Sequence, residues 1–140
     1  MNRKRILVVD DDAVVRKTLL NKLGAAGYEV LLANDGAGAM SSVRLERPDL
    51  ILLDISFPPD VAHGGGVSWD GFLLASWLQR MEEAKGIPII LISGHDSPEN
   101  IQRARKAAVA GFFPKPINLD GLTKAIAALI GDLAATSQAV

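Results

Sequence analysis

The sequence predicts an α/β fold in which a five-stranded parallel sheet carries helices on both of its faces. Two observations lead to this prediction. Short apolar runs alternate five times with longer stretches of helical spacing, a pattern typical of strand–helix–strand units. The apolar runs are continuous rather than interrupted by polar residues, as expected for strands that are buried on both faces. With 140 residues and no internal repeat, the chain is expected to form a single domain.

The clearest strand is Leu50–Asp54, in which four apolar residues are followed by a carboxylate. Pro48 precedes it and Pro58 follows it, so the segment cannot extend into a long helix. The same reasoning predicts four further strands, at Ile6–Val9, Tyr28–Ala33, Ile87–Ile92 and Gly111–Pro114.

The helices follow from apolar residues repeated at intervals of three and four. Along Ala13–Leu23 these residues form one face, with Asp12 as the expected N-cap rather than a metal ligand and Gly24 as the expected stop. Trp77 lies on the apolar stripe of a later helix and is expected to pack inward. The other expected helices run from Gly36 to about Arg47, over Gly71–Glu83, from Ser97 to about Ala110, and from Leu119 to about Leu133.

Composition excludes several classes of function. The formal net charge of -1 gives no electrostatic case for binding nucleic acid, and the absence of cysteine excludes disulfides and thiolate metal sites. His63 and His95 have no second ligand at a useful spacing, so histidine metal sites are not expected. No apolar stretch approaches the roughly 18 residues that span a bilayer. A cytoplasmic protein without membrane contact is therefore the expectation.

Chemically active side chains follow four of the predicted strands. Asp10 and Asp11 follow the first, Asp54 ends the third, Ser93 follows the fourth and Lys115 follows the fifth. Because the carboxyl ends of parallel strands meet at one edge, we expect these residues to converge there. Clustered carboxylates repel one another unless a cation joins them, and a purely oxygen ligand set favours Mg²⁺, with Mn²⁺ as the alternative. A lysine and a hydroxyl nearby complete a site for phosphoryl transfer to an aspartate.

These segments together resemble the receiver domain of two-component response regulators, over about residues 4–132. The resemblance implies a flavodoxin-like (βα)5 fold. The matching pieces are Ile6–Asp12, Pro48–Asp54 with Pro58, Leu91–Gly94 and Gly111–Pro116. Each piece is weak alone, but their occurrence in this order is highly specific.

The resemblance implies roles for the residues of the site. Asp54 would accept the phosphoryl group and Lys115 would contact it. Asp11 would bind Mg²⁺ directly, Asp10 through water, and Ser56 through its backbone carbonyl. The implied activity is that of a switch rather than an enzyme, which at most catalyses its own phosphorylation and dephosphorylation.

The resemblance also implies how the signal is passed on. Ser93 would act as the switch hydroxyl, Phe112 occupies the position of the switch aromatic, and the Lys115-Pro116 peptide bond would be cis. The phosphoryl donor would be a histidine kinase or a histidine phosphotransfer protein. A downstream protein would bind the face made by the fourth helix, fifth strand and fifth helix, with the chain a monomer or a phosphorylation-dependent dimer.

We expect residues 1–133 to form the receiver domain, with residues 134–140 as a disordered tail and no output domain. The connection Phe57–Asp70 is longer than receivers usually have, and the excess around Asp60–Ser68 is either a flap that controls access to Asp54 or a tolerated insertion. Three alternatives stay open: a receiver cut from a longer hybrid kinase or regulator, a phosphatase of the haloacid dehalogenase type, and a flavodoxin-like cofactor binder. The dehalogenase motif places its nucleophile after the first strand, where this chain lacks the expected threonine.

Overall fold

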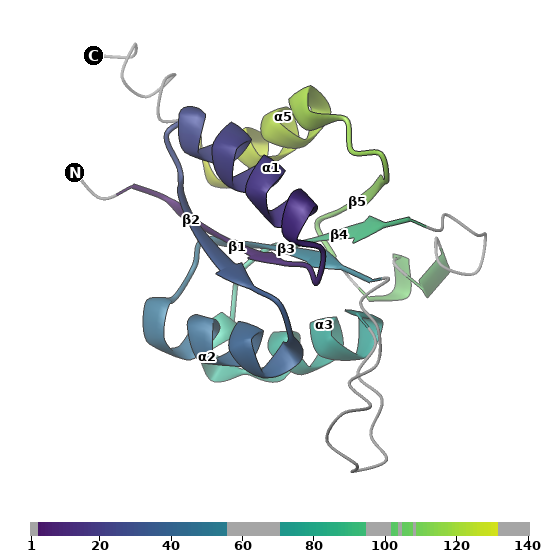
Figure 1. The fold of residues 1–140 in the computed structure, drawn as a ribbon. Helices are drawn as coiled ribbons and strands as arrows, with labels where there is room; N and C mark the ends of the chain where they lie inside the picture. The colour runs from purple at the N-terminus through teal and green to yellow at the C-terminus, as the bar shows by residue number, and fades with distance from the viewer. Residues whose placement is uncertain (1–2, 56–70, 95–101, 104, 108, 132–140) are drawn as a thin grey trace.

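The computed structural model describes residues 3–55, 71–94, 102–103, 105–107 and 109–131. Five parallel strands form one sheet with the order β2-β1-β3-β4-β5, which confirms the predicted fold class (Figure 1). The strands are β1 (Arg5–Val9), β2 (Glu29–Ala33), β3 (Leu50–Asp54), β4 (Ile89–Ser93) and β5 (Gly111–Pro114). The helices are α1 (Ala13–Ala25), α2 (Gly36–Glu46), α3 (Gly71–Arg80) and α5 (Leu119–Ile130), with a short 3-10 turn, η2 (Glu82–Ala84).

Some predicted features lie outside the described residues. These are the tail at 134–140, the long connection at 57–70, both histidines and Ser56. Of the helix predicted from Ser97 to about Ala110, residues 102–103 and 105–106 are described and are helical.

The helices cover the sheet as two separate layers. Figure 1 shows α1 and α5 on one face and α2 and α3 on the other. Successive side chains of a strand point to opposite faces, so each inner strand supplies both cores. In β3, Leu50 and Leu52 pack with the α1 and α5 layer, whereas Ile51 and Leu53 pack with the α2 and α3 layer. This double burial explains why the strands are continuous apolar runs.

Three predicted helix ends were wrong. The last helix, α5, ends at Ile130 rather than near Leu133. Gly24 lies inside α1, because the helix continues to Ala25 and the chain turns at Gly27, whose φ is +102°. The third helix ends at Arg80 rather than Glu83, and the chain continues as the separate turn η2. Backbone hydrogen bonds that tighten a last turn are not visible in a pattern of apolar residues.

Trp77 was also predicted to be packed inward, but 45% of it is exposed on α3. Leu74 and Leu78 of the same helix are fully buried, so the apolar stripe is narrower than its sequence suggested. A tryptophan at the margin of a stripe has both apolar and polar surface to place, which suits partial exposure.

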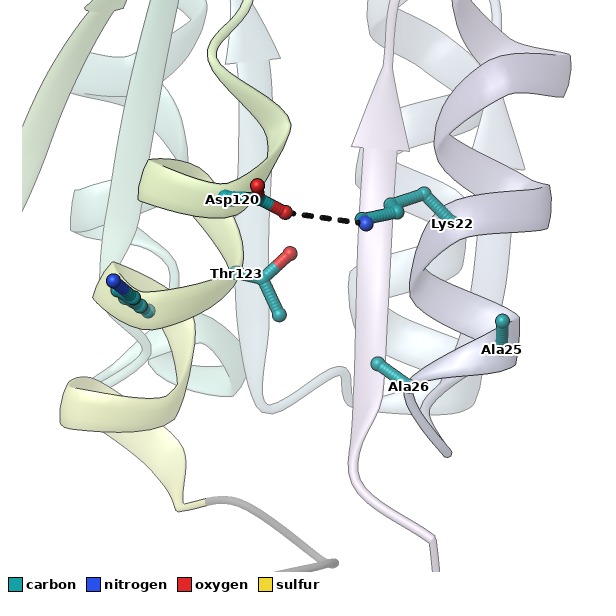
Figure 2. A pocket seen from close by; sticks show the side chains of 6 residues that line it. Lys22, Ala25, Ala26, Asp120 and Thr123 are labelled. Carbon is teal, nitrogen blue, oxygen red and sulfur yellow. Dashed lines mark hydrogen bonds and ion pairs between the residues drawn. The ribbon is translucent and has the colours of Figure 1, made fainter.

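Helix α5 is joined to α1 at the surface and, at its C-terminal end, to the segment that precedes β2. Between α1 and α5 lies an open groove of about 420 Å³, which the ion pair between Lys22 Nζ and Asp120 Oδ1 crosses at 3.3 Å (Figure 2). The buried Tyr28, just before β2, donates its hydroxyl to the carbonyl of Gly131 at 2.9 Å, where α5 ends. Within the described part of the chain, no helix combines the length and apolar character needed to cross a membrane.

The end of α2 offers a test of local backbone strain. Arg47 caps this helix with a φ of +47°, a left-handed conformation that costs a residue with a Cβ roughly 1–2 kcal/mol. Since Arg47 is exposed, Arg47→Gly should raise the free energy of unfolding by roughly 0.5–1 kcal/mol in urea denaturation. Arg44→Gly, inside the same helix, should lower it by about 1 kcal/mol. Equal destabilisation by both changes would contradict the strain at Arg47.

Candidate functional site

The carboxyl edge of the sheet brings two buried aspartates together. Val9 of β1 pairs with Leu53 of β3, so Asp10 and Asp54, each one residue further on, lie at the same level. Asp10 is 1% exposed and Asp54 is 2% exposed. Strand order therefore places side by side two carboxylates that lie far apart in the sequence, as the strand-end argument predicted.

Lys115 joins both carboxylates from the end of β5. Its Nζ lies 3.0 Å from Asp54 Oδ2 and 3.3 Å from Asp10 Oδ2. Its backbone N–H donates to the carbonyl of Ser93 at 2.8 Å, which fixes the start of the side chain against the end of β4. The Lys115-Pro116 peptide bond is cis, as the family resemblance implied.

The shared ammonium group and burial shift two pKa values. Burial raises the pKa of Asp10 above its ordinary value of 3.8, and the charge of Asp54 adds to this, while the Asp12 N–H and Lys115 oppose it. Burial alone would lower the pKa of Lys115, but its hydrogen bonds and charge interactions with Asp54 and Asp10 outweigh burial and raise it above 10.5. Lys115 therefore remains an ammonium group at neutral pH.

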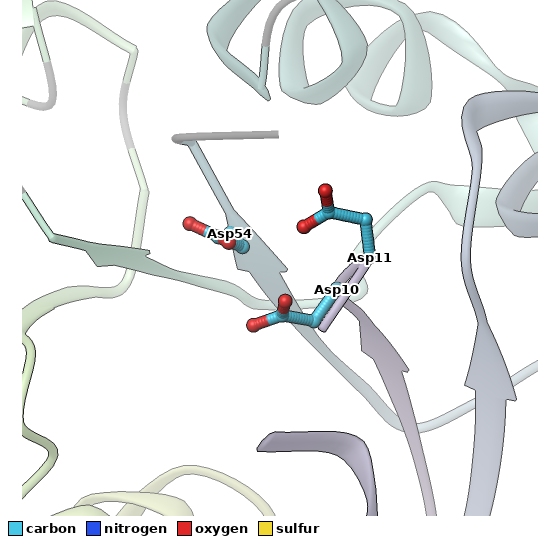
Figure 3. Close-up of side chains that lie close together, drawn as sticks. All are labelled: Asp10, Asp11 and Asp54. Atoms are coloured by element: carbon cyan, nitrogen blue, oxygen red, sulfur yellow. The ribbon is translucent and has the colours of Figure 1, made fainter. Parts of the chain in front are cut away.

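A third carboxylate completes an oxygen-rich cluster. Asp10, Asp11 and Asp54 each offer one carboxylate oxygen, and these oxygens all lie within 4.8 Å of one another (Figure 3). In an octahedral Mg²⁺ site with metal–oxygen distances of about 2.1 Å, opposite ligand oxygens are roughly 4.2 Å apart. The three carboxylates could therefore bind the ion after small side-chain movements, or with a water between one carboxylate and the ion. Asp11 is exposed, which leaves this side of the cluster open to solvent. The donor set suits a hard cation that keeps several waters.

Asp12 does not belong to this cluster. It is the N-cap of α1, and its Oδ1 accepts the N–H of Val14 at 2.9 Å, as predicted. The exposed acid next to the cluster thus starts the helix rather than contributing a ligand.

The two predicted switch residues lie on neighbouring strands. Ser93 ends β4 at the same sheet edge as Asp54 and is 1% exposed. Phe112 pairs with Leu91 in the β4–β5 register and packs, partly buried, against the α2 and α3 core. Phe113, the next residue, packs on the opposite face of the sheet.

Sequence reasoning missed two residues near the site. Arg16, on the first turn of α1, donates from Nη1 to the carbonyl of Asp10 at 2.7 Å. Val14, on the first turn, is 72% exposed. Val14 does not share the four-residue spacing of Val15 and Leu19, which form the inward face of α1. That spacing indicated that Val14 would face solvent. A side chain bonded to a backbone carbonyl, as in Arg16, has no comparable sequence signal.

Comparisons with known proteins agree on one family. The family model described as the response regulator receiver domain matches residues 6–127. The chain is 34% identical over 126 residues to the response regulator MprA of Mycobacterium leprae, covering 90% of this chain and 50% of that protein. It is 27% identical over 129 residues to the polar-differentiation response regulator DivK of Brucella anthropi, covering 92% and 98%. The chain thus spans about half the length of MprA but nearly all of DivK.

A solved structure supports the same family. The chemotaxis protein CheY4 of Vibrio cholerae matches with a TM-score of 0.77 and 26% identity, covering 91% of this chain and 99% of that one.

The raised pKa of Asp10 predicts a gain in stability when its charge is removed. Without metal, Asp10→Asn should raise the melting temperature by a few degrees, because the neutral amide avoids the cost of burying a carboxylate and its oxygen can still accept the Asp12 N–H. Below pH 3.8 the carboxyl is protonated in both folded and unfolded chains, so the gain should disappear there and grow as pH rises.

Thermal unfolding in EDTA at several pH values measures this effect. Asp12→Asn is the matched control, since asparagine caps a helix as well as aspartate and no stabilisation is expected. A lower melting temperature for Asp10→Asn at neutral pH would show that Lys115 more than compensates the burial of Asp10.

Proposed function

The chain belongs to the response regulator receiver domain family, and we propose that it acts as a phosphorylation switch with Asp54 as the phosphoryl acceptor. The observation that carries the proposal is the convergence of buried Asp54 with Asp10 and Lys115 at the carboxyl edge of the sheet. Receiver domains are signalling switches, so chemistry at this edge serves regulation rather than turnover of a metabolite. Family membership removes the grounds for the dehalogenase and flavin-binding alternatives.

The proposed chemistry is an in-line transfer to the Asp54 carboxylate. A carboxylate oxygen attacks the phosphorus of a phosphohistidine, the new P–O bond forms as the P–N bond breaks, and the electron pair returns to the imidazole. Lys115, already 3.0 Å from Asp54, would neutralise charge on the transferring oxygens. A positive group held in place before the reaction needs little reorganisation during it.

Asp10, Asp11 and Asp54 would hold Mg²⁺, with Mn²⁺ as the alternative, and the Ser56 carbonyl is a further proposed ligand that lies outside the described residues. When bound, the ion supplies positive charge to the phosphoryl oxygens. The chain itself contributes the arrangement of the carboxylates and the burial of Asp10 and Asp54.

We propose that Ser93 and Phe112 report the reaction. The Ser93 hydroxyl would move toward the phosphoryl group, and Phe112 would turn into the space that this movement frees. The face made by the fourth helix, β5 and α5 would then change shape for a downstream protein or a second copy of the chain.

The phosphoryl donor is proposed to be a histidine kinase or a histidine phosphotransfer protein that docks beside Lys115. An apolar pocket of about 230 Å³ lies there. Helix α1 and the segment after β5 line it with Val14, Val15, Thr18, Leu19, Lys115, Pro116, Ile117 and Leu119. An exposed apolar surface next to the reacting groups suits the apolar face of a donor helix.

The acceptor can be tested with a small phosphoryl donor. In the presence of Mg²⁺ and acetyl phosphate, the intact mass of the protein should increase by one phosphoryl group. Asp54→Asn keeps the shape and loses the nucleophile, so its labelling should fall to background, whereas Asp12→Asn should label normally. Equal labelling of the wild type and Asp54→Asn would refute the assignment.

Docking can be separated from chemistry by changing the exposed surface of α1. With a kinase that phosphorylates the wild type, Val14→Glu should slow phosphotransfer by about tenfold or more, because it places a charge in the apolar contact. Labelling by acetyl phosphate should stay within about twofold, since no docking surface is needed. Leu45→Glu on α2, where the leucine is 82% exposed, is the matched control for charge and should leave both rates unchanged. Equal slowing by both variants would place docking elsewhere.

A further inference from the structure

Arg16 makes a contact that links helix α1 to the metal-binding cluster. Its Nη1 donates to the backbone carbonyl of Asp10 at 2.7 Å, and the residue is partly buried. Its own N–H donates to the carbonyl of Asp12 at 3.0 Å as part of the first helical turn. The guanidinium group therefore reaches back from the helix to the strand end that carries the carboxylates.

The other polar groups of Asp10 are also bonded. Its N–H donates to the carbonyl of Ala33 at 3.1 Å, and its Oδ1 accepts the N–H of Asp12 at 2.9 Å. These contacts fix the backbone before Asp10 and the side chain itself. The contact from Arg16 fixes the peptide group that follows.

We propose that Arg16 is a positioning residue for the metal site, a role that rests on the proposed function. The Asp10 carbonyl belongs to the peptide plane that ends at the Cα of Asp11. Holding the oxygen of this plane sets its orientation, and with it the direction in which Asp11 leaves the backbone. Because Asp11 is exposed, its side chain has little packing to orient it, so its approach to Asp10 and Asp54 depends on this peptide group (Figure 3).

Positioning and charge have opposite effects on metal affinity. A guanidinium cation near the cluster repels Mg²⁺, so losing its charge alone would tighten binding. Losing its hydrogen bond would release the Asp10–Asp11 peptide and weaken binding. The sign of the change on removing Arg16 therefore decides between the two roles.

The test compares Arg16→Met with Arg16→Lys. Methionine keeps an unbranched apolar stem and loses the donor, so the Kd for Mg²⁺ by titration calorimetry should rise roughly tenfold, as for other residues that orient metal ligands. Lysine can still donate to the carbonyl and should restore the Kd to within about threefold. Lys17→Met, which removes an exposed cation from the same turn, is the matched control and should not raise the Kd.

Two further readouts distinguish positioning from a general structural effect. Without metal, the amide hydrogens of Asp11 and Asp12 should exchange faster in Arg16→Met, while those in β3 keep their protection. With acetyl phosphate, the Mg²⁺ concentration for half-maximal labelling should rise, while the rate at saturating Mg²⁺ stays within about twofold of the wild type.

An unchanged or lower Kd in folded Arg16→Met would overturn the proposal. If Arg16→Met does not fold, Arg16→Ala, which also lacks the donor and has the highest helix propensity, carries the same test, and an unchanged Kd for it also overturns the proposal. A wild-type protein that binds no Mg²⁺ would instead contradict the proposed function.

Discussion

The site depends on one lysine that compensates two buried carboxylates. Burying a charge is costly unless it is paired and hydrogen-bonded, and Asp10 and Asp54 share the ammonium group of Lys115. That group must cross the end of β4, because β5 and β3 are not neighbours and lie roughly 10 Å apart. The stem of Lys115 passes beside Gly94, where an added Cβ would lie at an ordinary contact distance of 3.9 Å from its Cδ. Strand order and the length of the lysine side chain together bring the ammonium group to both carboxylates.

The first turn of α1 has three separate roles at the carboxyl edge of the sheet. Asp12 starts α1, Val14 faces solvent beside the site, and Arg16 points back to the carbonyl of Asp10. Helical spacing separates these three directions within five residues. The same turn therefore contributes to a stable helix start, to the surface a donor would meet and to the backbone that carries the carboxylates.

The sequence was sufficient to predict the features that depend on the periodicity of apolar residues and on the positions at which strands end. Continuous apolar runs predicted the strands, and parallel geometry predicted that Asp10, Asp54 and Lys115 would meet. Features set by local hydrogen bonds were not predictable in this way: α1 passes through Gly24 to turn at Gly27. The role of Arg16 is of the same kind, because its partner is a backbone oxygen that every residue possesses. Ser56 stays a prediction.

The hydrogen bond between the Tyr28 hydroxyl and the Gly131 carbonyl fixes the position at which the chain leaves α5. This position determines how a change at Asp54 could reach the end of the helix. Helix α5 begins just after Lys115 at the carboxyl edge and spans 12 residues, a length of about 18 Å. It ends beside Tyr28, which precedes β2 at the opposite edge of the sheet. Gly131 therefore lies at the far side of the domain from Asp54. If Asp54 is phosphorylated as proposed, the structural change at Gly131 would be a tilt or shift of α5 as a rigid body, because Gly131 is too far away to contact the phosphoryl group.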